Sequence, residues 1–136
     1  MEKSNTQAVS IPASPSQVFD FIANPETLPL WAVGFCRGIR REGADWIVTT
    51  PRGDIRMRYD ADRARGTVDF HFSPAPGVEL SAFSRIVPNG SGAEYVFTQF
   101  QGPGMPDAVF DAQVSALGEE LQLLTNVIRA RAACPA

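Results

Sequence analysis

Two kinds of hydrophobic periodicity divide the chain. Residues 34–101 carry short runs rich in β-branched and aromatic residues, and apolar and polar positions alternate most clearly in Ile55-Arg56-Met57-Arg58-Tyr59. A period of two is typical of a half-buried strand. From Pro106 onward the apolar residues recur at steps of three and four, which predicts one long helix with a single apolar stripe. The stripe consists of Phe110, Val114, Leu117, Leu121, Leu124 and Ile128.

Turn signals separate the strand-like runs. Clusters of Gly, Pro, Asn and Asp recur at intervals of about 8–12 residues, a spacing typical of consecutive antiparallel hairpins. A strand at about 6–11 and two short helices at about 15–22 and 25–31 precede them. We therefore predict seven antiparallel strands, one before the short helices and six at about 34–101. Only the long helix has a stripe wide enough to cover the sheet, so the fold class is α+β, a curved sheet wrapped around one helix.

The stretch IPASPSQVFDFIANPETLPLWA explains why the first helix is short. Ser14 can cap this helix and Pro15 can occupy its first position. Pro25 disfavours helical geometry at Asn24, so we expect the helix to end after about two turns. Trp31 follows the break, and we expect it at one end of the sheet.

This opening resembles the START/Bet v 1-like superfamily, also called SRPBCC, and within it the small bacterial polyketide cyclase/dehydrase and lipid transport branch. The resemblance implies a single domain over residues 1–136 with a helix-grip fold, in which seven antiparallel strands grip the C-terminal helix around an elongated cavity. Members of the superfamily bind lipids, sterols, polyketides and other apolar molecules, as carriers, enzymes or interaction modules. The residues that carry the resemblance are Ile11-Pro12-Ala13-Ser14-Pro15, Val18-Phe19-Asp20-Phe21-Ile22, Asn24-Pro25-Glu26-Thr27-Leu28-Pro29 and Trp31.

Composition narrows the choice of partners. A net charge of −3 and a pI near 5.1 argue against nucleic acid as the main partner. No stretch approaches the ~20 consecutive apolar residues of a membrane span, and the N-terminus lacks the apolar core of a signal peptide. We therefore expect a soluble, cytoplasmic protein without stable membrane insertion. Cys36 and Cys134 are expected to be free thiols, and a homodimer is left open.

Hairpin geometry predicts which side chains face the helix. If Asn89-Gly90 is a two-residue turn, Arg85 falls opposite Glu94, and this charged pair marks the solvent face. The opposite, inner face then carries small residues beside large ones. Its predicted members are Leu80, Ala82, Ser84, Ile86, Tyr95, Phe97 and Gln99.

The predicted inner wall is mostly apolar with a few polar groups, a pattern typical of a site for an apolar or aromatic small molecule. An inward Phe or Leu is more often plain core than a ligand contact. Buried Tyr and Gln are more telling, since an unpartnered polar group in a core costs about 1–3 kcal/mol. The predicted ligand-binding residues are Trp31, Met57, Tyr59, Phe70, Phe72, Ser84, Tyr95, Phe97, Gln99, Phe110, Val114, Leu117 and Leu121.

Catalytic chemistry has three candidates: His71, Tyr59 and Tyr95. His71 is the one histidine of the chain and the obvious general base. However, strand parity puts it with Asp69 on the solvent face, away from the predicted inner wall. The two tyrosines would donate or accept protons on the inner face.

Metal and cofactor sites are not predicted. One histidine and two distant cysteines lack ligand spacing, so we expect no metal and no cofactor. Glu119 and Glu120 are not a carboxylate pair, because neighbouring helix residues diverge by about 100°; both fall mainly away from the apolar stripe.

These observations favour binding or transport of a hydrophobic small molecule, of lipid, polyketide or aromatic type, in an internal cavity between the sheet and the C-terminal helix. The alternative is a cofactor-free enzyme, a cyclase, dehydratase or hydrolase, that uses Tyr or His as acid–base groups. A protein-interaction module on the same fold is the third possibility.

Overall fold

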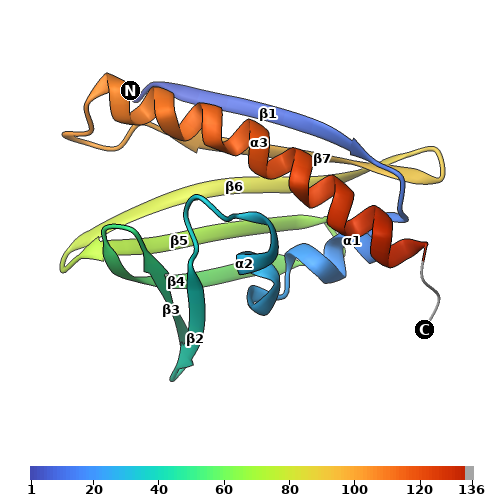
Figure 1. Cartoon of the computed structure of the whole chain (residues 1–136), viewed down its shortest axis with the longest axis horizontal. Coiled ribbons are helices and arrows are strands. Elements are labelled where there is room, and N and C mark those ends of the chain that lie inside the picture. The colour runs from blue at the N-terminus through green and yellow to red at the C-terminus, as the bar shows by residue number, and fades with distance from the viewer. Residues whose placement is uncertain (134–136) are drawn as a thin grey trace.

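The computed structural model describes residues 1–133, and its elements follow the predicted order (Figure 1). The helical elements are α1 (Pro15–Ile22), the 3-10 turn η1 (Pro25–Thr27), α2 (Leu28–Trp31) and α3 (Asp107–Ala132). The strands are β1 (Ser4–Ile11), β2 (Gly38–Glu42), β3 (Asp45–Thr50), β4 (Gly53–Asp62), β5 (Thr67–Ala75), β6 (Val78–Asn89) and β7 (Gly92–Phe100).

One antiparallel sheet holds all seven strands in the order β1-β7-β6-β5-β4-β3-β2. The first strand therefore pairs with the last, and the other strands follow as successive hairpins. The long helix α3 runs over β1 and reaches α1 and α2 at its C-terminal half (Figure 1). This arrangement confirms the predicted α+β class with a curved sheet, a long C-terminal helix and short helices between the first two strands.

The break after α1 forms as predicted. Ser14 and Gln17 make a capping box, in which the Ser14 hydroxyl accepts from the Gln17 N–H at 3.2 Å and the Gln17 side chain accepts from the Ser14 N–H at 3.0 Å. Asn24 then caps η1 by accepting from the Glu26 N–H at 3.1 Å. The second predicted helix is two pieces, η1 and α2, and the next strand begins at Gly38.

The β6–β7 hairpin differs from the predicted register. Asn89 pairs with Gly92, so Gly90 and Ser91 form the turn, and Gly90 adopts the positive φ of 59° that its position requires. Arg85 lies opposite Val96, and the predicted Arg85–Glu94 pair is therefore wrong. The shift moves the pairing by two residues, an even number, so every side chain keeps its predicted face.

The apolar stripe of α3 is buried as predicted, although Val114 is only half-buried. Two polar residues, Glu120 and Thr125, are buried beside the stripe, which corrects the prediction that Glu120 lies away from it. Gly118 is exposed and lies close to Gln7 on β1, because a Cβ there would be 3.3 Å from the side-chain oxygen of Gln7. None of the helices among the described residues is long and apolar enough to cross a membrane.

Candidate functional site

A row of aromatic rings crosses the inner face of the sheet. The ring centroids are 5.0 Å apart for Tyr59 and Phe70, 5.8 Å for Phe70 and Phe97, and 6.3 Å for Phe97 and Tyr95. Phe70 and Phe97 meet across β6 because the residues between them in the ladder, Ala82 and Ser84, are small. We call Tyr59, Phe70, Phe97 and Tyr95 the aromatic row.

The aromatic row is buried at some positions and accessible at others. Phe70 and Tyr95 are buried, whereas Tyr59 and Phe97 are half-buried. Phe72 continues the inner face of β5; it is half-buried and packs against Phe35, with 6.1 Å between ring centroids. The inner face therefore presents aromatic surface that is only partly covered by the rest of the protein.

The two tyrosine hydroxyls lie in an apolar environment. Burial raises the pKa of both Tyr59 and Tyr95, so both stay protonated at neutral pH and can donate a hydrogen bond. The Tyr95 hydroxyl has no partner of good geometry among the described residues. Ser84 partly offsets the rise in the Tyr95 pKa, and the Ser84 hydroxyl donates to the Val68 carbonyl at 2.6 Å.

Cys36 is a further polar side chain in the interior, and the sequence did not predict that it would be buried there. Its side chain is buried, its Sγ donates to the Gly38 carbonyl at 3.3 Å, and burial raises the thiol pKa to about 11. Cys36 also contributes to the raised pKa of Tyr59. It is a free thiol, as predicted, whereas Cys134 lies outside the described residues.

Trp31 is a core residue at the end of α2. Its side chain is buried, and its indole N–H has no acceptor among the described residues. The residue thus shares two properties with Tyr95, full burial and an unpartnered donor. Its position in the core shows that the helix break positions a buried anchor.

Glu120 is a buried carboxylate that the sequence analysis missed. Its Oε2 accepts from the Gly34 N–H at 3.1 Å, which ties α3 to the segment between α2 and β2. Burial raises the pKa of Glu120, and the backbone N–H groups of Gly34 and Phe35 partly offset that rise. The sequence signal for its burial was weak, because Glu120 lies at a polar position on the edge of a regular apolar stripe.

The remaining predicted ligand-binding residues do not gather at one place. Met57, Leu117 and Leu121 are buried in the main core with the aromatic row. The other three lie towards the other end of α3. The ring of Phe110 is 5.9 Å from the Lys3 ammonium, and the Val114 carbonyl accepts from Gln7 at 2.9 Å. The Gln99 amide on β7 donates to Asn5 at 3.4 Å.

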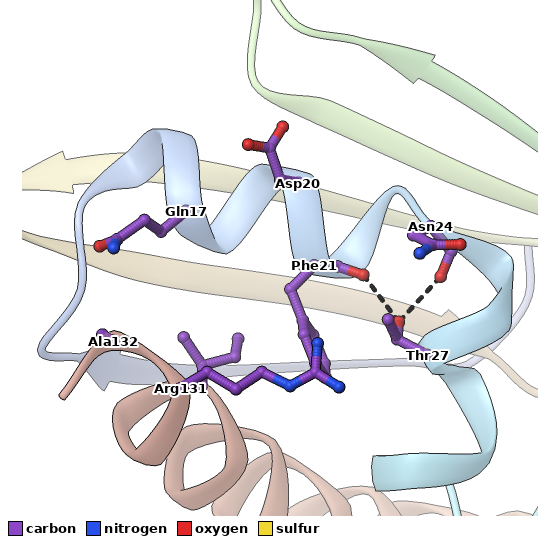
Figure 2. Close-up of a pocket in the computed structure, with 8 residues that line it drawn as sticks. Gln17, Asp20, Phe21, Asn24, Thr27, Arg131 and Ala132 are labelled. Atoms are coloured by element: carbon purple, nitrogen blue, oxygen red, sulfur yellow. Dashed lines mark hydrogen bonds between the residues drawn. The ribbon is translucent and has the colours of Figure 1, made fainter. Parts of the chain in front are cut away.

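Two hollows among the described residues lie outside the space between the sheet and α3. One, of about 270 Å³, lies between α1 and the end of α3 (Figure 2). There Phe21 and Arg131 point toward one another, with the guanidinium 4.9 Å from the ring centroid. The other, of about 430 Å³, lies beside the turn between β5 and β6 and is lined by Ile47, Asp54, Ile55, Arg56 and residues 73–77.

Comparison of the fold with solved structures gives many matches, whereas no profile of a protein family and no curated protein matches the sequence. Ara h 8.0201 superposes with a TM-score of 0.66 at 16% identity, over 96% of this chain and 99% of that chain. The chain has the helix-grip fold of the Bet v 1-like proteins.

Two further solved structures match over most of this chain. The di-domain ARO/CYC BexL from the BE-7585A biosynthetic pathway matches with a TM-score of 0.70 at 15% identity, over 91% of this chain and 45% of that chain. The Aha1 dimer from Colwellia psychrerythraea matches with a TM-score of 0.71 at 15% identity, over 93% of this chain and 96% of that chain.

His71 lies on the outer face of this Bet v 1-like sheet, as strand parity predicted. Its Nδ1 is 2.7 Å from the Ser81 hydroxyl on the neighbouring strand, and its ring packs edge-on against Phe83 at 6.4 Å. The sheet separates His71 from the aromatic row, because alternate residues of one strand face opposite sides. His71 therefore cannot exchange a proton with a molecule bound at the inner face.

Proposed function

We propose that the protein binds a hydrophobic small molecule of aromatic or polyketide type against the aromatic row, between the sheet and α3. The observation that carries this proposal is the combination of partly accessible inward aromatic side chains with a buried, unpartnered Tyr95 hydroxyl. Flat apolar molecules stack on such rings, and a few polar groups in an apolar wall orient them.

The hydroxyls define what the bound molecule should carry. Because burial raises the pKa of Tyr59 and Tyr95, each presents an O–H donor and not a phenolate. A ligand with a carbonyl or ether oxygen would satisfy the Tyr95 donor that the described residues leave unpaired. This preference supports a polyketide-like or quinone-like molecule over a plain hydrocarbon.

A cofactor-free cyclase or dehydratase is the second candidate, supported by the protonated tyrosines at the inner face. Tyr59 would donate a hydrogen bond to a substrate oxygen there and polarise its carbonyl, since it is half-buried and so nearer to an incoming molecule than Tyr95. Its raised pKa favours this role over proton transfer. The fold likeness to an ARO/CYC protein agrees with this candidate but does not distinguish it from a carrier. Loss of turnover with retained binding in Tyr59→Phe would favour the enzyme.

Titration with the apolar fluorophore 1-anilinonaphthalene-8-sulfonate tests binding directly. We expect saturable fluorescence, and Phe72→Ala is expected to weaken it several-fold because Phe72 is a half-buried ring of the inner face. Phe83→Ala is the matched control, since Phe83 is a partly exposed ring on the outer face with 43% of its surface accessible. Equal effects of the two substitutions, or fluorescence that never saturates, would contradict the proposal.

A further inference from the structure

We propose that the outer face of the sheet holds a site for a divalent transition-metal ion, formed by Asp60, Asp69 and His71. Asp60 lies on β4, and Asp69 and His71 lie two residues apart on β5. The register sets Asp60 directly opposite Asp69, so all three side chains leave the same face of the sheet. One ligand atom from each residue lies within 4.8 Å of the other two.

The donor set indicates the kind of ion. One imidazole nitrogen and two carboxylate oxygens suit first-row transition metals such as Zn²⁺ and Co²⁺, whereas Ca²⁺ and Mg²⁺ prefer oxygen alone. Tetrahedral ligands at about 2.0–2.1 Å from Zn²⁺ lie about 3.4 Å apart, so the three atoms need to approach by at most about 1.4 Å. Asp60 is exposed and can make that movement by rotating its side chain.

The surroundings of His71 hold its ring in an orientation that suits metal binding. Nδ1 lies 2.7 Å from the Ser81 hydroxyl and 3.5 Å from a Glu79 carboxylate oxygen. In the proposed site these groups hold Nδ1, and Nε2 binds the ion. Metal-binding histidines are typically fixed through their second nitrogen in this way. Arg58, the cation opposite His71, has its guanidinium 3.8 Å from Glu79, so that carboxylate offsets part of its charge.

The ring signals of His71 in an NMR titration with Zn²⁺ test the site, because His71 is the one histidine of the chain. In untagged, metal-free protein we expect a saturable one-to-one shift of these signals, with calorimetric heat over the same concentrations. Asp69→Asn and Asp60→Asn are each expected to weaken Zn²⁺ binding about tenfold or more, and Ser81→Ala about tenfold through the loss of ring orientation.

Asp111→Asn is the matched control, since it removes the same charge from an exposed position of α3 and should leave the affinity unchanged. Circular dichroism establishes that each variant is folded; should Asp69→Asn unfold, the exposed Asp60→Asn decides. His71 signals that stay unmoved, a shift that never saturates, or equal affinity in wild type and Asp60→Asn would overturn the proposal.

Discussion

On the outer face of the sheet, several charged side chains have partners of opposite charge. Arg56 lies 3.0 Å from Glu42 and 3.2 Å from Asp45, and Arg40 lies 3.0 Å from Asp54. On the inner side, the Tyr95 hydroxyl and the Trp31 indole N–H are buried without a partner among the described residues. The same sheet thus separates satisfied polar groups in solvent from unsatisfied ones in the core.

This difference shows where the protein has unpaired hydrogen-bond donors that a ligand could use. A surface ion pair in water contributes little to stability, because the solvent competes for both charges. A buried donor without an acceptor is unfavourable in the free protein, so a ligand that supplies the acceptor gains what the protein lacks. The contrast between the faces therefore favours the inner side as the place where a small molecule is recognised.

The largest expected effect comes from truncating the centre of the aromatic row. Phe70→Ala should lower the free energy of unfolding by about 3–5 kcal/mol, because Phe70 is buried and touches rings on both sides. Phe83→Ala on the outer face should change it by about 0.5 kcal/mol or less. Urea unfolding of both variants measures the difference, and equal losses would remove the distinction between the faces.

The sequence predicted faces better than it predicted pairs. Alternation along Ile55-Arg56-Met57-Arg58-Tyr59 depends only on strand periodicity, and it assigned the inner and outer positions correctly. The register of the hairpin depends on which residues form the turn in PNGSG, and Gly90-Ser91 competes there with Asn89-Gly90. An error of two residues therefore left every face intact and still gave Arg85 the wrong partner.

The candidate sites were harder to predict than the fold, because they depend on contacts between distant residues. The burial of Glu120 follows from the path of the segment at Gly34, which no local pattern specifies. The approach of Asp60 to Asp69 and His71 follows from the β4–β5 register. By contrast, the short first helix could be predicted because Ser14 and Pro25 act on their own neighbours.

Glu120 refines the comparison, since it is a buried carboxyl group that does have a partner. Glu120→Ala leaves the Gly34 N–H without its acceptor and should cost about 1–3 kcal/mol of unfolding free energy. Glu119→Ala on the exposed neighbour is the control and should change little. Chemical denaturation at pH 7 distinguishes them; a Glu120→Ala variant as stable as Glu119→Ala would mean that this contact does not hold α3.

The pH dependence of stability gives an independent check on Glu120. Burial raises its folded-state pKa above the ordinary value of 4.5, so the folded state takes up the proton more readily than the unfolded state. The part of its stability contribution that comes from this proton uptake is therefore fully present below pH 4.5 and lost as the pH rises through the folded-state pKa. The hydrogen bond from the Gly34 N–H is a separate contribution. Glu120→Gln should flatten this part of the stability curve, whereas Glu119→Gln should leave it.

Tyr95→Phe should have a smaller effect and the opposite sign. Removing a buried hydroxyl that lacks a partner should stabilise the ligand-free protein by about 1 kcal/mol, while the ring keeps its packing against Phe97. The melting temperature should rise, and binding of an oxygen-bearing aromatic molecule should weaken. A lower melting temperature would show that the hydroxyl already has a partner, with Ser84 the nearest candidate.

Arg56→Gln should have the smallest effect. Although Arg56 bonds two carboxylates, Arg56 and Glu42 are exposed and Asp45 is partly exposed, so water and salt compete for them. We expect no measurable change in the urea midpoint at physiological salt, and a small decrease at low salt that disappears as ionic strength rises. A salt-independent loss of stability comparable to that of Glu120→Ala would mean that the ion pairs of the outer face act like buried contacts. In that case solvent exposure would not explain the difference between the two faces. The unpartnered donors on the inner side would then not be the feature that distinguishes it as the ligand-binding side.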